Sequence, residues 1–120
     1  MVKENYVRKA ILADALELSP KIRKGDREEI MASEGISPLR ALVMPFTYDN
    51  AKIYTIIGTE KEGVIGMFGS NPTQLPEYGV AWLLSSEQLF KHTKQFLKEC
   101  PYWVAQMSQG YEYIYNFVDK

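Results

Sequence analysis

Three short apolar runs in the middle of the chain constrain the fold most strongly. Residues 53–58 (IYTIIG) are rich in β-branched side chains and almost continuously apolar, and residues 64–69 (VIGMFG) and 80–84 (VAWLL) have the same character. Such runs are typical of strands that are covered on both faces. The polar link at residues 59–63 predicts a hairpin between the first two strands. We therefore expect a sheet with helices packed on both sides.

Helical patterns flank these strands. Asp26 and Ser37 stand where helix N-caps belong, and Gly35 stands where a helix ends in the left-handed conformation. The spacing of Ser85 and Gln88 predicts a capping box. The expected elements beside the three strands are a strand at 6–10, helices at 11–18, 26–34 and 38–45, a loop at 70–79, helices after Ser85 and from Pro101 to Gly110, and a strand at 111–118.

The order of these elements predicts a mixed sheet in one domain. A strand, a helical crossover and a second strand occupy residues 80–118, and such a crossover joins parallel strands. The hairpin before it is antiparallel. The whole chain of 120 residues is the size of a single domain, residues 1–120, with no internal repeat.

Charge and composition exclude several functional classes. The 14 basic and 15 acidic residues give a formal net charge of -1, which argues against a cationic nucleic-acid surface. A single cysteine, Cys100, excludes an intrachain disulfide framework and a cysteine-rich metal site. The first ten residues contain no signal-peptide core, and the longest apolar run, residues 78–84, is too short to cross a bilayer. We expect a soluble, intracellular protein.

Five segments in a fixed order carry a family resemblance: residues 23–30 (RKGDREEI), 37–39 (SPL), 67–69 (MFG), 79–84 (GVAWLL) and 115–119 (YNFVD). Together they resemble the Gcn5-related N-acetyltransferase (GNAT) superfamily, and most closely a bacteriophage branch that includes internal virion protein A of short-tailed phages. The resemblance implies an α/β fold of the mixed α+β kind. It has a GNAT-like sheet of about five strands and helices on both faces, and it is expected to stop here after the fifth strand.

The resemblance also implies where acetyl-CoA would bind. In GNAT enzymes the pantetheine arm lies along the fourth strand, and a glycine-containing loop after it holds the diphosphate on backbone N–H groups. Here no glycine follows the strand, Glu87 would repel phosphates, and a Ser85 cap would occupy N–H groups. Trp82 is most simply a core residue. The positions that would contact the cofactor are Ala81, Trp82, Leu83, Leu84, Ser85 and Ser86.

Few residues offer catalytic chemistry. Glu77 precedes the fourth strand, near the place where many GNAT enzymes hold a base, although Pro76 beside it makes a turn residue the simpler interpretation. His92, the one histidine, is expected on a solvated helix face. Cys100 is expected to be a small packed residue, because no close cation favours its thiolate. No metal site is expected.

The last predicted strand is the most aromatic part of the chain. In the resembling family, further residues follow an aspartate like Asp119 and help to shape the acyl site, whereas this sequence stops at Lys120. A terminal strand with a bare edge and face favours association. We expect it to pair with a second copy or with a phage or host protein, through Tyr111, Tyr113, Tyr115 and Phe117.

Two functions from different classes remain open at this stage. The favoured one is a non-catalytic GNAT-like phage protein that acts as a virion component or a protein-binding module, with no cofactor. The alternative is an N-acyltransferase that transfers the acetyl group of acetyl-CoA directly to an amine. Inhibition of a host defence enzyme by binding alone is a further possibility. The expected location is the virion or the host bacterial cytoplasm.

Overall fold

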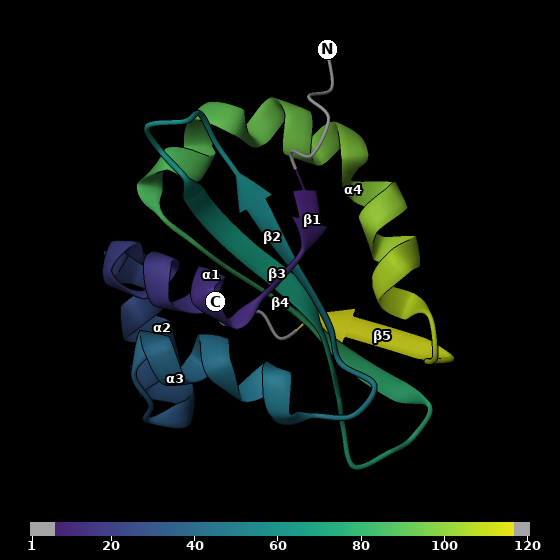
Figure 1. Ribbon diagram of the computed structural model, residues 1–120. Coiled ribbons are helices and arrows are strands. Elements are labelled where there is room, and N and C mark those ends of the chain that lie inside the picture. The colour runs from purple at the N-terminus through teal and green to yellow at the C-terminus, as the bar shows by residue number, and fades with distance from the viewer. Residues whose placement is uncertain (1–6, 117–120) are drawn as a thin grey trace.

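The computed structural model describes residues 7–116 (Figure 1). The mixed α/β class predicted from the sequence is confirmed. The elements are β1 (Val7–Lys9), α1 (Leu12–Leu18), the 3₁₀ helix η1 (Ser19–Lys21), α2 (Lys24–Glu34), α3 (Pro38–Val43), the 3₁₀ helix η2 (Met44–Thr47), β2 (Lys52–Ile57), β3 (Val64–Pro72), β4 (Tyr78–Ser85), the 3₁₀ helix η3 (Glu87–His92), α4 (Thr93–Ser108) and β5 (Tyr113–Asn116).

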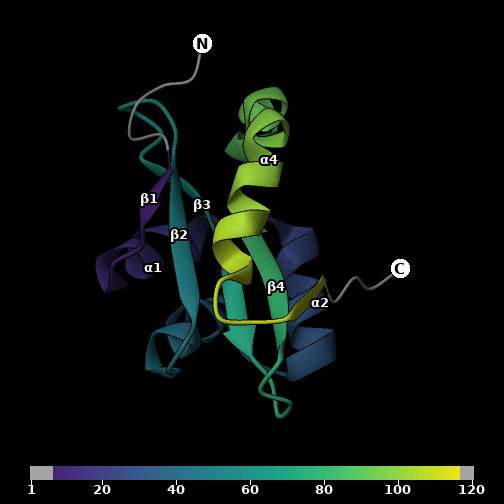
Figure 2. The ribbon, with the colours of Figure 1, turned by 90° about the vertical axis from the view of Figure 1, so that its right-hand side faces the viewer.

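The strands form one five-stranded sheet in the order β1-β2-β3-β4-β5. Neighbours from β1 to β4 are antiparallel, and β4 and β5 are parallel. Figure 2 shows β5 beside β4, below the end of α4. The predicted hairpin and the predicted parallel pair are both confirmed. The parallel pair follows because the helical connection from β4 returns over the sheet and enters β5 in the same direction.

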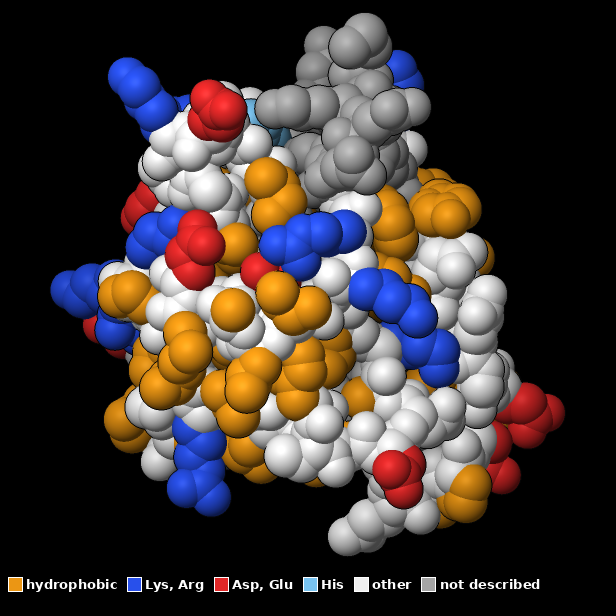
Figure 3. Space-filling model, viewed as in Figure 1, with side chains coloured by type: hydrophobic (Ala, Val, Ile, Leu, Met, Phe, Trp, Pro, Cys, Tyr) orange, Lys and Arg blue, Asp and Glu red, His pale blue; other side chains and the backbone are white. Residues whose placement is uncertain are grey.

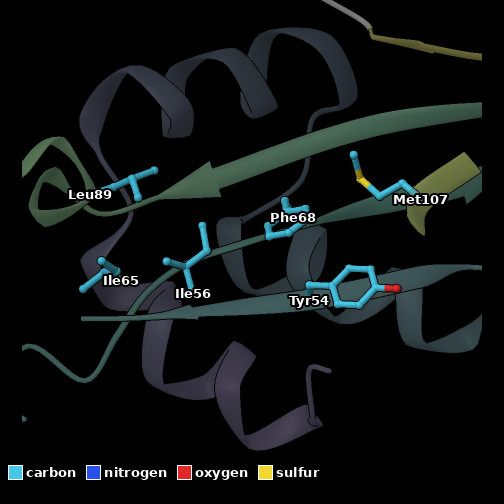
Figure 4. Packing of buried hydrophobic residues seen from close by; sticks show 6 residues of the cluster. All are labelled: Tyr54, Ile56, Ile65, Phe68, Leu89 and Met107. Atoms are coloured by element: carbon cyan, nitrogen blue, oxygen red, sulfur yellow. The ribbon is translucent and has the colours of Figure 1, made fainter. Parts of the chain in front are cut away.

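Two apolar cores lie on opposite faces of the sheet. One lies under η3 and α4, and the other lies under α1 and α3. Neighbouring residues of one strand divide between them, since Met67 contributes to the second and Phe68 to the first. This explains the continuous apolar runs. The first core contains Tyr54, Ile56, Ile65, Phe68, Leu89 and Met107 (Figure 4), and the second contains Ala15, Leu18, Ile22, Leu42, Val64 and Met67.

The expected loop at residues 70–79 is shorter in the structure. β3 continues to Pro72, β4 begins at Tyr78, and Pro72 pairs with Gly79. The hydroxyl of Thr73 donates to the carbonyl of Tyr78 across the turn, at 2.9 Å. Pro72 is tolerated because β2 pairs with β3 only as far as Ser70, so β3 has an unpaired edge at Pro72.

The second helix begins two residues earlier than predicted. Its N-cap is Arg23, so Gly25 and Asp26 lie in the first turn, and Asp26 is not the cap. The reason is that the Asp26 carboxylate binds outside its own helix, as described below. The other two predicted signals are confirmed: Gly35 ends α2 with φ of 67°, and the Ser37 hydroxyl accepts from the backbone N–H of Arg40 at 3.2 Å.

Residues 93–108 form one helix, although Pro101 was expected to open a second one. Proline removes one backbone donor from a helix interior and is usually unfavourable there. Here the second half is held by packing, because Trp103 and Met107 contact the core under α4. The helix ends before Gly110, which has a positive φ of 90°. None of the helices in residues 7–116 is long and apolar enough to span a membrane.

Candidate functional site

The candidate site lies along the second half of β4 and the turn that follows it. The β4–β5 pairing extends from Tyr78–Tyr113 to Ala81–Asn116. Within the described residues, the second half of β4, from Trp82 to Ser85, pairs only with β3. This is the stretch that the resemblance assigns to the pantetheine arm, and the structure places its predicted residues together along β4 and the turn after it.

The side chains of this stretch divide between the two faces of the sheet. Trp82 and Leu84 pack against the core under α1 and α3, as the core interpretation of Trp82 predicts. The indole N–H of Trp82 also donates to the amide oxygen of Asn71 at 3.2 Å. Ala81 packs on the opposite core, while Leu83 is 43% exposed. Leu83 is therefore the apolar side chain here that a bound molecule could cover.

The turn after β4 is bound by the first turn of α2. The backbone N–H of Ser85 donates to a carboxylate oxygen of Asp26 at 3.2 Å. In return, the backbone N–H of Arg23 donates to the carbonyl of Ser85 at 2.9 Å. Ser85 is only 4% exposed. Two elements that are about sixty residues apart in the sequence thus meet at the position where a cofactor phosphate was considered.

Ser86, and not Ser85, caps the following 3₁₀ helix. Its hydroxyl accepts from the backbone N–H of Gln88 at 3.2 Å, and its carbonyl accepts from the N–H of Leu89 at 3.3 Å. Its own N–H donates to the carbonyl of Ile65 at 2.9 Å. The predicted cap was wrong by one residue because Ser85 still belongs to the strand, where it pairs with Gly66.

Charges around this turn are paired within the protein. The Arg23 guanidinium donates to both carboxylate oxygens of Asp26, at 2.6 and 3.3 Å, and lies 5.0 Å from the centre of the Phe90 ring. The hydrogen bond to Asp26 raises the pKa of Arg23, and Glu87 adds a smaller effect in the same direction. Asp26 therefore holds the Arg23 guanidinium, and Glu87 and Glu29 act on it more weakly.

A second carboxylate, that of Glu62, contacts basic side chains at the same end of the sheet. Glu62, in the β2–β3 turn, lies 3.0 Å from Nε2 of His92 and 3.8 Å from the ammonium of Lys91. The backbone N–H of Thr59 and the contact with His92 lower the pKa of Glu62. His92 was expected to be solvated, but its side chain is only 23% exposed and Glu62 orients its ring. The spacing Thr59-x-x-Glu62 is itself a capping-box pattern and could have indicated this turn.

Glu77 lies far from this turn. It precedes β4 while Ser85 ends it, so the two are separated by the length of the strand, roughly 25 Å at 3.3 Å per residue. Its side chain is exposed, and its carbonyl accepts from the N–H groups of Glu112 and Tyr113, both at 2.9 Å. The structure therefore does not bring the candidate base together with the predicted cofactor positions.

The predicted association residues lie at this other end of β4. Tyr111 precedes β5: its backbone N–H donates to the carbonyl of Ser108 at 3.0 Å in the turn after α4, so the strand begins at Tyr113. Its hydroxyl donates to the carbonyl of Asn50 at 2.7 Å. Burial raises the pKa of Tyr111. Tyr113 is 55% exposed and stacks on Tyr78, with ring centres 4.9 Å apart. The main chain of Tyr115 lies in β5. Phe117 lies outside the described residues.

Two further predictions concern residues without an assigned role. The main chain of Cys100 lies within α4, and its predicted packing stays a prediction. In the part of the chain that the structure describes, no group of three or more metal-ligating side chains comes together.

Similarity to known proteins is found in structure and not in sequence. A scan against protein-family models finds no match, and a search of curated proteins finds no relative. A transcriptional regulator from Bacillus halodurans C-125 is similar with a TM-score of 0.61 and 13% identity, over 95% of this chain and 81% of that chain. A tetramutant of the BH1408 protein from Bacillus halodurans has a TM-score of 0.58 and 14% identity, over 100% and 84% of the two chains.

A third similar structure bears the name of an enzyme. It is a putative phosphinothricin N-acetyltransferase, with a TM-score of 0.54 and 13% identity, over 85% of this chain and 65% of that chain. Likenesses at such low identity show the fold alone. The chain therefore has the GNAT-like fold that the resemblance predicted, with its mixed five-stranded sheet.

Proposed function

We propose that this chain is a GNAT-like protein that acts by binding another protein and does not use acetyl-CoA. The observation that supports this is the contact between the Asp26 carboxylate and the backbone N–H of Ser85. A carboxylate of the protein occupies a donor at the turn where the resemblance would place the cofactor diphosphate.

The remaining groups at the turn also fit a diphosphate poorly. The N–H groups of Ser86, Gln88 and Leu89 donate to acceptors of the protein. A bound diphosphate would have to displace those acceptors and approach Asp26 and Glu87. Moving negative charge toward carboxylates in a partly buried place is unfavourable.

Thermal unfolding in the presence of acetyl-CoA tests this proposal. A ligand at 100 times its Kd adds about 2.7 kcal/mol of stability, which would raise the Tm of a domain of this size by roughly 10 °C. We expect no rise at millimolar acetyl-CoA. A clear, saturable rise with the wild-type chain would overturn the proposal.

A pair of variants identifies why acetyl-CoA is expected not to raise the Tm. Asp26→Asn removes the charge beside Ser85, whereas Glu28→Gln removes the same charge from an exposed position on α2. If Asp26 alone excludes the cofactor, acetyl-CoA will stabilise D26N and not E28Q. If neither variant responds, the cap at Ser86 is sufficient to exclude it.

The proposed partner site is the outer edge of β5. Among the described strands this one ends the sheet order, and its first residue, Tyr113, is 55% exposed. Strand edges with exposed aromatic side chains readily accept another strand. The partner would be a phage or host protein, such as a host defence enzyme that is inhibited by binding, or a second copy of the chain. The virion or phage setting rests on the sequence resemblance alone. Sedimentation that shows only monomer at micromolar concentration, with and without candidate partners, would count against this site.

The second candidate function is N-acyl transfer from acetyl-CoA to an amine. One observation favours it: among residues 7–116, the stretch from Trp82 to Ser85 pairs with β3 alone. It is also in keeping with the fold shared with the N-acetyltransferase named above. Release of free CoA thiol from acetyl-CoA in the presence of a panel of amines would establish this function and reject the first.

A further inference from the structure

Helix α1 exposes large apolar side chains to solvent. Its sequence is LADALEL, in which Asp14 and Glu17 are the charged residues. Asp14 is buried, whereas Leu12 is 51% and Leu16 is 58% exposed. A surface helix normally carries polar side chains on its outer face, and a helix that is apolar on nearly all sides is normally covered. The composition of α1 therefore indicates that another molecule covers its outer face.

The exposed leucines lie on the side of α1 that faces away from β1. Leu12 and Leu16 are four residues apart, so they lie on one side of the helix about one turn apart. Asp14 is two residues from each of them, about 200° around the helix, and therefore lies on the opposite side. Its carboxylate binds the Arg8 guanidinium of β1 at 2.8 Å. The leucines thus lie on the other side of α1, where Figure 1 shows α3.

Helix α3 extends this apolar surface. Leu39 is 38% exposed, and Val43, one turn later, is half-buried. Ile11, the N-cap of α1, is 56% exposed. Figure 3 shows hydrophobic side chains gathered over α1 and α3, and we call Ile11, Leu12, Leu16, Leu39 and Val43 the α1–α3 face. Contiguous exposed apolar side chains of this kind mark surfaces that bind another molecule.

The exposed charges around the α1–α3 face are mainly positive. The Arg8 side chain is 40% exposed, while its partner Asp14 is only 5% exposed. Arg8 lies beside the start of α1, because its guanidinium and the N–H of Ile11 donate to the same oxygen of Asp14. Arg40 in α3 is exposed and forms no ion pair with a described carboxylate. Exposed cations of this kind favour a partner that carries acidic side chains.

We propose that the α1–α3 face binds an amphipathic helix of another protein, in which Asp or Glu residues border an apolar stripe. Leu12 and Leu16 are spaced by one turn, as are the apolar residues of such a helix, so the side chains of the two can interdigitate. Arg8 and Arg40 would then meet carboxylates of the partner. The surface is separate from the edge of β5, so this inference adds a second contact to the proposed function and does not depend on the first.

Two other occupants fit the charges less well. A second copy of the chain would bring the same excess of exposed cations to the contact. An anionic membrane would attract the arginines, but it would repel the carboxylate of Glu17, which is 49% exposed on the same helix. Glu17 is compatible with a helix partner, because Lys21 lies 3.6 Å from it and offsets its charge.

Titrations with synthetic helices, followed by nuclear magnetic resonance, test the proposal directly. The probe is a peptide of about 18 residues, long enough to form a helix, with leucines at i, i+3, i+4 and i+7 and glutamates beside them. A second peptide has lysine in place of each glutamate, and a third has the first composition in scrambled order. We expect saturable shifts of the backbone signals of Leu12, Leu16 and Leu39 with the first peptide alone. The shifts should weaken as salt increases, because the arginines are exposed.

Variants separate this face from non-specific attraction. Leu16→Ser should weaken binding of the acidic helix by about tenfold, the effect of leaving half of a leucine unburied. Leu75→Ser is the matched control, because Leu75 is 57% exposed but lies in the turn between β3 and β4. Arg40→Gln should weaken binding by roughly threefold. Lys61→Gln removes the same charge from an exposed position in the β2–β3 turn and should change nothing.

Several results would overturn the proposal. They are the absence of shifts at about 1 mM acidic helix, equal binding of the lysine or scrambled peptide, equal weakening by L75S, and shifts confined to β5. Binding to phosphatidylserine vesicles, or a dimer in sedimentation, that L16S abolishes while no helix binds would assign the face to a membrane or a second copy instead. The Tm of each variant is measured first, so that a loss of binding is not confused with unfolding. None of these readouts involves acetyl-CoA or the edge of β5, so this inference can fail while the proposed function stands.

Discussion

At the end of the sheet where β4 stops, carboxylates of the protein bind the turns; at the opposite end, where β2 begins, two lysines line a hollow that contains no carboxylate. We call these the Ser85 end and the Lys52 end. Asp26 and Glu62 accept backbone N–H groups at the Ser85 end. Among the described residues, neither Lys9 nor Lys52 forms an ion pair with a carboxylate. The fold thus supplies its own anions at one end and leaves its cations available at the other.

This difference bears on the proposed function. A GNAT-like fold provides backbone donors after its fourth strand, and those donors attract anions unless the chain itself satisfies them. Here Asp26, Ser86 and Glu62 accept from the backbone N–H groups of Ser85, Gln88 and Thr59 at the Ser85 end. The contrast between the two ends can be tested by replacing the carboxylates and the lysines in turn and measuring the stability of each variant.

Substitution of Asp14 is expected to cause the largest loss in the free energy of unfolding, and the smaller losses below are compared with it. This carboxylate is 4% exposed and accepts from both guanidinium nitrogens of Arg8, from the N–H of Ile11 and from the hydroxyl of Thr55. Asp14→Ala leaves these donors without their acceptor, so it should lower the free energy of unfolding by about 3 kcal/mol. Urea denaturation measures the change. Glu28→Ala, at an exposed position, should stay within about 0.5 kcal/mol.

Asp26→Ala should follow with a loss of about 2 kcal/mol, because it frees the Ser85 N–H and the Arg23 guanidinium but leaves a more accessible site. The Asp26 side chain is 13% exposed. The same urea experiment applies, and Asp26→Asn should lose less, since an amide oxygen still accepts from Ser85. A loss for D26A no larger than that for E28A would mean that the Ser85 end is not held by this carboxylate.

The loss of stability at low pH should reflect the protonation of Asp14 and Glu62. Burial raises the pKa of Asp14, but the hydrogen bonds from Arg8, Ile11 and Thr55 outweigh it and leave the pKa below its usual value. The pKa of Glu62 is lowered as well. A carboxylate whose pKa is lower in the folded state contributes stability that is complete above its unfolded pKa and is lost as the pH falls through the folded pKa.

Stability should therefore be level above about pH 5 and fall steadily below about pH 4. Asp14→Asn should remove most of this fall and Glu62→Gln a smaller part. Denaturation midpoints measured from pH 7 to pH 3 give the comparison, with Glu28→Gln as the matched control. An unchanged slope in both D14N and E62Q would show that these hydrogen bonds do not form in solution.

Much of this architecture follows from local sequence patterns. The β-branched runs locate β2, β3 and β4, and the crossover predicts the parallel β5, because strand propensity and chain connectivity act over short stretches. Gly35 and Ser37 are equally local signals. The candidate site was predicted less well. The contact of Asp26 with Ser85 joins distant segments, and no local pattern specifies which backbone donor an acidic side chain will reach.

Two other differences have the same origin. Pro101 would end an isolated helix, yet packing of Trp103 and Met107 on the sheet keeps α4 continuous, so tertiary contacts override a local preference. His92 looked solvated because a helix pattern cannot show that the β2–β3 turn brings Glu62 to it. The hollow at the Lys52 end has no sequence pattern, because Phe46, Lys9 and Lys52 come from three separate elements.

The smallest stability effect is expected at the Lys52 end. Lys9→Ala removes a charge that lies on the same side of the sheet as Lys52 and has no carboxylate partner among the described residues, so the free energy of unfolding should change by less than about 0.5 kcal/mol. Lys52→Ala also removes the contact with the Tyr111 ring, worth about 0.5 kcal/mol at an exposed position, so it should be the less stable of the two.

Raising the salt should stabilise the wild type more than K9A, since screening and mutation remove the same repulsion. Urea denaturation at low and high salt measures this difference. A loss above 1 kcal/mol for K9A would mean that the fold itself uses this lysine, and the contrast between the two ends would then no longer hold.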